Sequence, residues 1–143
     1  MPANDSIIKQ WIPMIGLHAL HQVEESISFF QWYLDNAAKI PPWLLILNVR
    51  NAERIVQHPG YFIVASMVQI SLVIAVAFIF RNHERLSRIL MLFYMLGLAF
   101  FFIWHIMTSY LAHSYAPVLV TCLAGLYLIP VWIYRLFRTN NLK

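Results

Sequence analysis

Two histidines and two adjacent glutamates lie close together in an otherwise apolar stretch, HALHQVEESISFF, at residues 18–30. They are His18, His21, Glu24 and Glu25. Imidazole nitrogens and carboxylate oxygens are ligands that zinc and iron use in proteins, and carboxylates also act as general bases. On an α-helix, which turns about 100° per residue, His18, His21 and Glu25 fall within about 60° of one another. The spacing therefore predicts one helix face that can bind a cation or relay a proton.

The rest of the chain has the composition of a membrane protein. Of its 143 residues, 61% are hydrophobic and 11% are charged, whereas about a quarter of an average soluble domain is charged. Four largely apolar runs have the length of about 20 residues that a bilayer requires: approximately 11–34, 61–80, 89–110 and 116–136. Lipid permits only helices or closed barrels, and these runs lack the alternation of strands. The sequence therefore predicts an all-α integral membrane four-helix bundle that forms a single domain over residues 1–143.

The connection between the first two runs is long and amphipathic. Residues 40–56, IPPWLLILNVRNAERIV, begin with a helix-start signal at the two prolines and then mix apolar residues with charged ones. This pattern predicts a short helix that lies at the membrane interface between spans one and two.

The basic residues predict the orientation of the chain. Arginines and lysines occur in the loop at 81–88 and in the tail at 135–143, whereas the loop at 112–117 has none. By the positive-inside rule, a multi-pass protein with four spans then has both termini in the cytoplasm. Three basic residues fall on the opposite side: Lys39, Arg50 and Arg54. No basic tract with interleaved aromatic residues suggests nucleic acid, so the expected surroundings are membrane lipid.

The glutamates need a partner if they lie inside the membrane. An ionised acid at mid-bilayer costs about 2.5–3.5 kcal/mol, which protonation, a basic partner or a cation must offset. Counted from the same side, Glu24 and Glu25 lie about 20 Å up the first span and His105 lies about 24 Å up the third. We therefore expect a cluster of His21, Glu24, Glu25 and His105.

Two further histidines are expected at the outer mouth of this cluster. His58 precedes the second span and His113 follows the third. Three hydroxyl side chains also lie near it, although each is more typical of a side chain bonded within its own helix: Ser28, Thr108 and Thr121.

The motif HQVEE, residues 21–25, resembles the defining motif of the HXXEE-domain family of small integral membrane proteins. The downstream segment HIMTSYLAHSYAPVLVT, residues 105–121, is similar to a later segment of that family, in which a histidine precedes a Tyr-x-Pro stretch. The resemblance implies a site at His21, Glu24 and Glu25. It implies no activity, because the function of the family is uncharacterised.

A mononuclear site for a divalent metal fits these residues best. The expected ligands are His21, Glu25, His105, His58, His113 and His18. Zinc is expected rather than iron, because di-iron carboxylate sites draw acids from several helices and both acids here lie on one. Glu24 and Glu25 are the expected catalytic residues, one of them acting as base on a metal-activated water. The predicted function is a metal-dependent membrane enzyme with hydrolytic or lipid-modifying activity on a lipid or another apolar substrate.

Two other functions remain open at this point. The glutamates can form structural hydrogen bonds to histidines in a non-enzymatic protein that binds a metal or small molecule, or they can serve a proton- or cation-coupled carrier. The chain has no evident inverted repeat of the kind found in carriers, although a homo-oligomer could supply one.

Overall fold

The computed structural model describes the backbone of residues 3–138 and the side chains of residues 7–138, and all regular structure within this range is helical. The α-helices are α1 (Ala3–Glu24), α2 (Phe30–Asn36), α3 (Val49–Gln57), α4 (Pro59–Ile79), α5 (Glu84–Leu111) and α6 (Leu119–Arg138). A π-helical turn, Glu25–Phe29, joins α1 to α2, and two short 3₁₀ turns follow at Ala37–Lys39 and Pro42–Leu44. The expectation of an all-α chain is confirmed for the described residues.

Three helices are long and apolar enough to cross a membrane: α4, α5 and α6. The most apolar 18-residue stretches of α4, α5 and α6 have mean hydropathies of 2.6, 2.2 and 1.7, respectively. Much of the apolar surface of these helices faces outward. In α4 only 11% of this 18-residue stretch is buried within the protein. Soluble proteins rarely expose so much contiguous apolar surface to water, so these helices indicate a lipid bilayer environment. The fourth expected span, α1, does not reach the same hydropathy, because polar side chains including His18 and His21 interrupt it.

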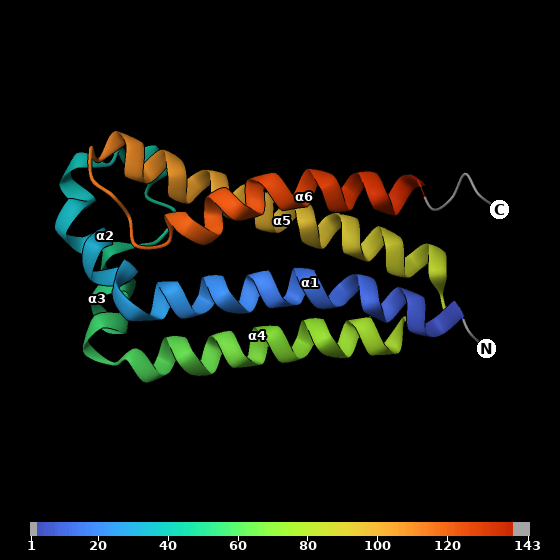
Figure 1. Cartoon of the computed structure of the whole chain (residues 1–143). Helices are drawn as coiled ribbons and strands as arrows, with labels where there is room; N and C mark the ends of the chain where they lie inside the picture. Colours follow the sequence, from blue (N-terminus) through green and yellow to red (C-terminus); the bar gives the residue numbers. More distant parts are fainter. Residues whose placement is uncertain (1–2, 139–143) are drawn as a thin grey trace.

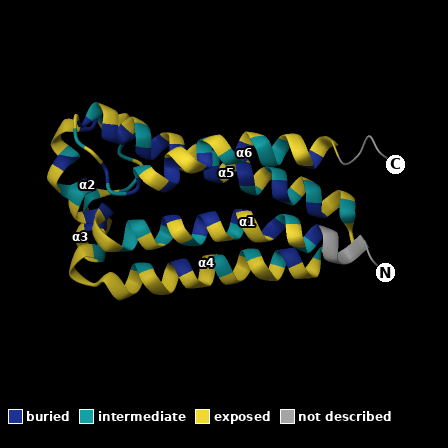
Figure 2. Cartoon of the chain, in the orientation of Figure 1, coloured by how far each residue is buried: buried dark blue, intermediate teal, exposed yellow. Residues whose placement is uncertain are grey.

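The long helices run side by side in two pairs (Figure 1). α1 packs along α4, and α5 packs along α6, while α1 also contacts both helices of the second pair. α2, α3 and the loop before α6 gather at one end of the molecule, and the described chain begins and ends at the other. Buried residues concentrate on the facing sides of α1, α5 and α6, whereas α4 is exposed over most of its surface (Figure 2).

The segment predicted as one interfacial helix is shorter and more broken than expected. After the 3₁₀ turn at Pro42–Leu44, helix α3 begins only at Val49. The side chain of Asn48 accepts a hydrogen bond from the backbone N–H of Arg50 at 2.9 Å, which is the N-cap that defines this start.

Helices α5 and α6 approach most closely at a glycine. A Cβ atom on Gly125 would lie 2.1 Å from Cε2 of Phe102, so only glycine allows this ring to sit against α6. Phe102 is fully buried, and its ring contacts the ring of His21 edge-on at 4.9 Å. The close helix contact therefore helps to position a residue of the candidate site.

Candidate metal centre

Three side chains from two helices converge in the protein interior. His21 and Glu25 come from α1 and the π-helical turn, and His105 comes from α5. Oε1 of Glu25 lies 3.1 Å from Nε2 of His105 and 3.9 Å from Nε2 of His21. The potential ligand atoms of the three residues all lie within 4.8 Å of one another, and no other group of this kind occurs among the described residues. This group could hold a metal ion.

The π-helical turn begins at Glu25, within the motif itself. A π-turn inserts an extra residue into the helix and changes which side chains share a face, and such turns are frequent at functional sites. Here the turn ends at Phe29, which is 1% exposed and lies edge-on to the ring of His105 at 4.5 Å. The turn thus places Glu25 and Phe29 together against α5.

The imidazole of His105 is enclosed by aromatic rings and lacks hydrogen-bond partners among the described residues. Its side chain is fully buried between Phe29 and Trp104, whose ring lies 4.7 Å away. Nδ1 has no partner, and Nε2 approaches Glu25 without the alignment of a hydrogen bond. Burying a polar group without a partner costs about 1–3 kcal/mol. An ion at Nε2 would satisfy one of the two unpartnered nitrogens, whereas Nδ1 lacks the oxygen partner that usually orients a metal-bound histidine.

The hydroxyl group of a threonine contacts two residues of the motif, Glu24 and His21. Oγ1 of Thr121, on α6, lies 2.5 Å from Oε2 of Glu24 and 2.8 Å from Nδ1 of His21. An ionised carboxylate can only accept, so with Glu24 ionised the single hydroxyl hydrogen is donated to Glu24 and Nδ1–H of His21 donates to the hydroxyl oxygen. The neutral His21 ring then carries its proton on Nδ1. This tautomer leaves the lone pair of Nε2 directed toward Glu25 and His105.

Glu24 also caps helix α6. The backbone N–H of Thr121, in the first turn of α6, donates to Oε2 of Glu24 at 3.3 Å. First-turn N–H groups have no partner within their own helix, and a carboxylate is favoured at this positive end of the helix dipole. Glu24 is therefore compensated by the start of α6, whereas Glu25 faces the two histidines without a hydrogen bond from either Nε2 atom.

The other predicted site residues lie apart from this group. Nδ1 of His18 lies 2.7 Å from the hydroxyl of Tyr94, and its Nε2 lies 3.1 Å from Nε2 of Gln22. His58 is exposed at the start of α4 beside Tyr61, and His113 is exposed just after α5, where its backbone has φ 48°. The structure therefore does not bring His18, His58 or His113 to the three-residue group.

Of the three candidate hydroxyls, Thr108 bonds within its own helix, to the carbonyl of His105 at 2.9 Å, as the sequence suggested. Thr121 instead bridges two helices. The sequence analysis did not identify Tyr94, Gln22 or Ser66 as polar neighbours of His18. The hydroxyl of Ser66 donates to Gln22 at 2.6 Å. In the sequence, the only indication of this contact is that Ser66 is a polar residue within an apolar helix.

A cavity of about 570 Å³ adjoins the site. His21 and Glu25 form part of its wall, and aromatic side chains form much of the rest: Phe29, Phe30, Phe62, Phe93, Phe101 and Trp104. Phe93 and Phe101 are also exposed on the outside of α5. The cavity therefore extends from the polar group to the outer, apolar surface between α4 and α5.

Comparison with known proteins identifies one relationship. The sequence profile of the family described as "Protein of unknown function with HXXEE motif" matches residues 12–134. This range contains His21, Glu24, Glu25 and His105. No curated protein and no solved structure matches the chain.

Proposed function

The chain belongs to the HXXEE family, and we propose that its motif binds one divalent cation inside the membrane. The ligands are Nε2 of His21, Oε1 of Glu25 and Nε2 of His105. The observation that carries the proposal is the convergence of these three atoms in a buried position where neither Nε2 atom has a hydrogen-bond partner among the described residues.

One of the three separations between the ligand atoms matches tetrahedral coordination, and the other two require small side-chain shifts. Two ligands bound to zinc at about 2.0–2.1 Å lie roughly 3.3 Å apart. The separation of 3.1 Å between Glu25 and His105 fits this value, and the separation of 3.9 Å between Glu25 and His21 needs only a small side-chain shift.

The surroundings of His21 support the same assignment. Metal-bound histidines usually donate their second N–H to an oxygen that fixes the tautomer. Thr121 accepts this hydrogen bond from His21, and Glu24 orients Thr121 in turn. Glu24, which the sequence suggested as a catalytic base, acts in this proposal as a positioning residue through Thr121.

Zinc suits the site better than iron. Two imidazoles and one carboxylate form the protein ligand set of several catalytic zinc sites and also of mononuclear iron oxygenases. At a given set of nitrogen and oxygen ligands, Zn²⁺ binds more tightly than Fe²⁺. Three protein ligands leave a fourth position for water, which zinc would acidify for hydrolysis.

The adjoining cavity favours a lipid or another apolar substrate. Its volume of about 570 Å³ lies within the range of about 300–1,000 Å³ typical of small-molecule sites. Its aromatic wall would hold an apolar chain while the ester or amide of the substrate reaches Glu25 and the metal. We therefore propose a metal-dependent membrane hydrolase or lipid-modifying enzyme.

We further propose that α1 is a fourth span and that both termini are cytoplasmic. α1 lies alongside α4, which is apolar enough to cross a membrane, and the described chain begins and ends at one end of the bundle (Figure 1). The polar side chains that lower the hydropathy of α1 are directed in large part toward the other helices, since His18 and His21 are buried.

A carrier is the second candidate, favoured by one observation. A row of polar contacts crosses three helices, from Tyr94 through His18 and Gln22 to Ser66. The amide nitrogen of Gln22 donates to Nε2 of His18, so Nδ1–H of His18 donates to Tyr94. Within this row, the imidazole of His18 is the group that can take up and release a proton near neutral pH. A pH gradient is imposed on liposomes that contain either the wild-type protein or His18→Ala. Loss of the gradient with the wild type, and its persistence with His18→Ala, would favour a carrier over an enzyme.

Elemental analysis of protein purified without chelators tests the proposed metal site. We expect about one divalent ion per chain in the wild type and in His113→Ala, whose histidine lies outside the group. His105→Ala should lose the ion and still insert into the membrane. A metal-free wild type would contradict the proposal.

A further inference from the structure

The cavity beside the metal group has a second set of polar residues in its wall. Besides His21 and Glu25, five polar side chains from α1, α4 and α5 line it: His18, Gln22, Ser66, Gln69 and Tyr94. Four of the five form the hydrogen-bonded row that crosses these helices. Gln69 differs, because it makes no hydrogen bond to another described residue.

Gln69 is the central residue of α4, which extends over Pro59–Ile79. It therefore lies about 15 Å from either end of the helix. Its side chain is exposed, and α4 is the most apolar of the helices able to cross a membrane. At this depth there is no water to satisfy an amide, so Gln69 needs a polar partner from outside the described chain.

The row next to Gln69 also retains unused hydrogen-bond donors. Nδ1–H of His18 donates to the hydroxyl oxygen of Tyr94, which leaves the hydroxyl hydrogen of Tyr94 without an acceptor among the described residues. The amide nitrogen of Gln22 carries two hydrogens and uses one of them for Nε2 of His18. Donors from three helices thus line one cavity, and a ligand with oxygen atoms would satisfy them.

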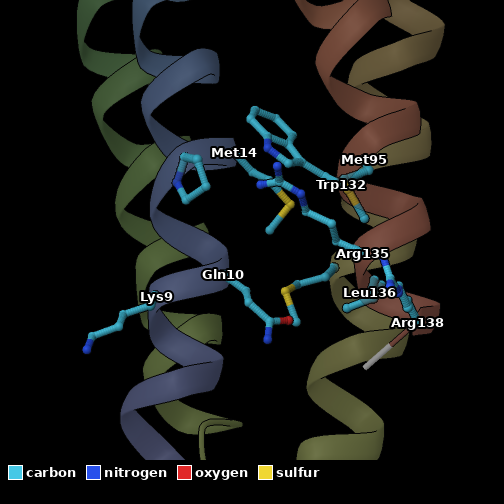
Figure 3. A pocket seen from close by; sticks show the side chains of 10 residues that line it. Lys9, Gln10, Met14, Met95, Trp132, Arg135, Leu136 and Arg138 are labelled. Carbon is cyan, nitrogen blue, oxygen red and sulfur yellow. The ribbon is translucent and has the colours of Figure 1, made fainter. Parts of the chain in front are cut away.

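The charge of the cavity indicates that these oxygen atoms are uncharged. Glu25 is the only acidic residue, and neither lysine nor arginine occurs, among the described residues that line it. Basic residues instead line a separate cavity between α1, α5 and α6, at the end where the described chain begins and ends (Figure 3): Lys9, Arg135 and Arg138. A phosphate at the depth of Gln69 would be an ion in lipid without a basic side chain beside it, which is costly.

We propose that the substrate is an uncharged acyl lipid with hydroxyl groups close to its ester or amide, as in a monoacylglycerol. This inference rests on the proposed function. Gln22 precedes Glu25 by three residues, or about 4.5 Å of helix rise, which is comparable to the few bonds between the ester carbonyl and the glycerol hydroxyls. The hydroxyls would contact Gln22, Gln69 and Tyr94, and the acyl chain would follow the aromatic wall. Hydrolysis of the ester by water would give a fatty acid and glycerol.

Thermal unfolding of the full chain in a neutral detergent tests the substrate class. The protein is titrated with three lipids that share one acyl chain and one ester: monooleoylglycerol, its phosphate monoester, and methyl oleate, which lacks hydroxyl groups. We expect monooleoylglycerol to give a saturable rise in the unfolding midpoint at the lowest concentration. The same order should hold in His105→Ala, because His105 does not line the cavity.

Gln69→Leu tests the contact with the hydroxyl groups. The half-saturating concentration of monooleoylglycerol should rise about five-fold, which corresponds to about 1 kcal/mol, the usual net contribution of one hydrogen bond. The titration with methyl oleate should not change. Gln57→Leu is the matched control, since Gln57 is exposed at the end of α3 and does not line the cavity, and it should titrate like the wild type. The wild-type order of the three lipids needs no variant.

Four results would overturn the proposal. Equal stabilisation by methyl oleate would show a purely apolar cavity, and stronger stabilisation by the phosphate monoester would show a charged headgroup. A Gln69→Leu titration identical to that of the wild type would remove the contact. A wild-type dimer in detergent that Gln69→Leu makes monomeric would show that a second copy of the chain covers Gln69.

Failure of this inference differs from failure of the metal site. If the wild type contains the ion but does not show the expected order of lipids, the substrate class is wrong and the metal site stands. If the wild type is metal-free and still shows the expected order, the lipid site stands and the proposed enzyme does not.

Discussion

The carboxylate of Glu24 accepts hydrogen bonds from both the hydroxyl and the backbone N–H of Thr121, at 2.5 and 3.3 Å, although the two residues are 97 positions apart in the sequence. This contact joins the end of α1 to the first turn of α6. The same hydroxyl lies 2.8 Å from His21, so one threonine couples the packing of two helices to the tautomer of a proposed metal ligand.

Replacement of Thr121 by valine tests this coupling. The variant keeps the side-chain shape and loses the hydrogen bonds to Glu24 and His21, so we expect a loss of stability of about 1.5–3 kcal/mol. Metal affinity should fall about 10–100-fold, as is usual when the partner of a ligand is removed. Unfolding and competition with a metal-binding dye measure the two effects. Thr108→Val is the control, because Thr108 bonds within its own helix; if both variants lose metal affinity equally, Thr121 has no special role.

The two glutamates should respond differently to amidation. Glu25→Gln removes a proposed ligand and should abolish stoichiometric metal binding. Glu24→Gln should retain the metal with reduced affinity, because it disturbs only the support of His21, and it should destabilise the start of α6. Metal content and thermal unfolding of the two variants distinguish the roles. Loss of the ion in Glu24→Gln with retention in Glu25→Gln would reverse the assignment.

The contact between α5 and α6 should not tolerate a methyl group at Gly125. A Cβ there meets Phe102 at 2.1 Å, and such overpacking typically costs about 1–3 kcal/mol. The displaced Phe102 ring would also disturb His21, so weaker metal binding should accompany the loss of stability. Gly16→Ala, where nothing lies within 4 Å of the new Cβ, should instead be neutral or stabilising by up to about 1 kcal/mol. Equal unfolding midpoints for both variants would contradict the packing seen here.

The four-span topology predicts opposite locations for two reporter fusions. A fusion at Lys143 should lie in the cytoplasm, and a fusion after Ser114, in the loop between α5 and α6, should lie outside. Reporter activity or accessibility to an impermeant thiol reagent measures the two locations. Two fusions on the same face would exclude a crossing by α6 and the model of four spans.

Much of the fold could be predicted because membrane helices have a strong compositional signal. The three most apolar runs of the sequence correspond to α4, α5 and α6. The meeting of His21 and Glu25 with His105 could also be predicted, since polar groups at matching depths in lipid have few alternatives to contacting one another. His58 and His113 do not join the group, because depth in the membrane alone does not determine which way a side chain at the end of a helix points, and both are exposed.

Two features of the site depend on tertiary packing and have no local sequence signal. The π-helical turn at Glu25–Phe29 changes the helical phase within the motif, so the 100° rule used for Glu24 and Glu25 does not hold across it. The bridge formed by Thr121 depends on where α6 starts, which is set by the loop before it and by Glu24 itself. A threonine in an apolar helix is usually bonded to its own helix, as Thr108 is, so the sequence could not distinguish the two.

Anomalous diffraction at the zinc edge, measured on crystals of the wild-type protein prepared without added chelator, tests the metal site most directly. We expect one peak between α1 and α5, about 2.0–2.2 Å from Nε2 of His21, Oε1 of Glu25 and Nε2 of His105. Crystals of His105→Ala should lack this peak. A wild-type map without a peak at this position, in which Glu25 is hydrogen-bonded to a histidine instead, would contradict metal binding at this group.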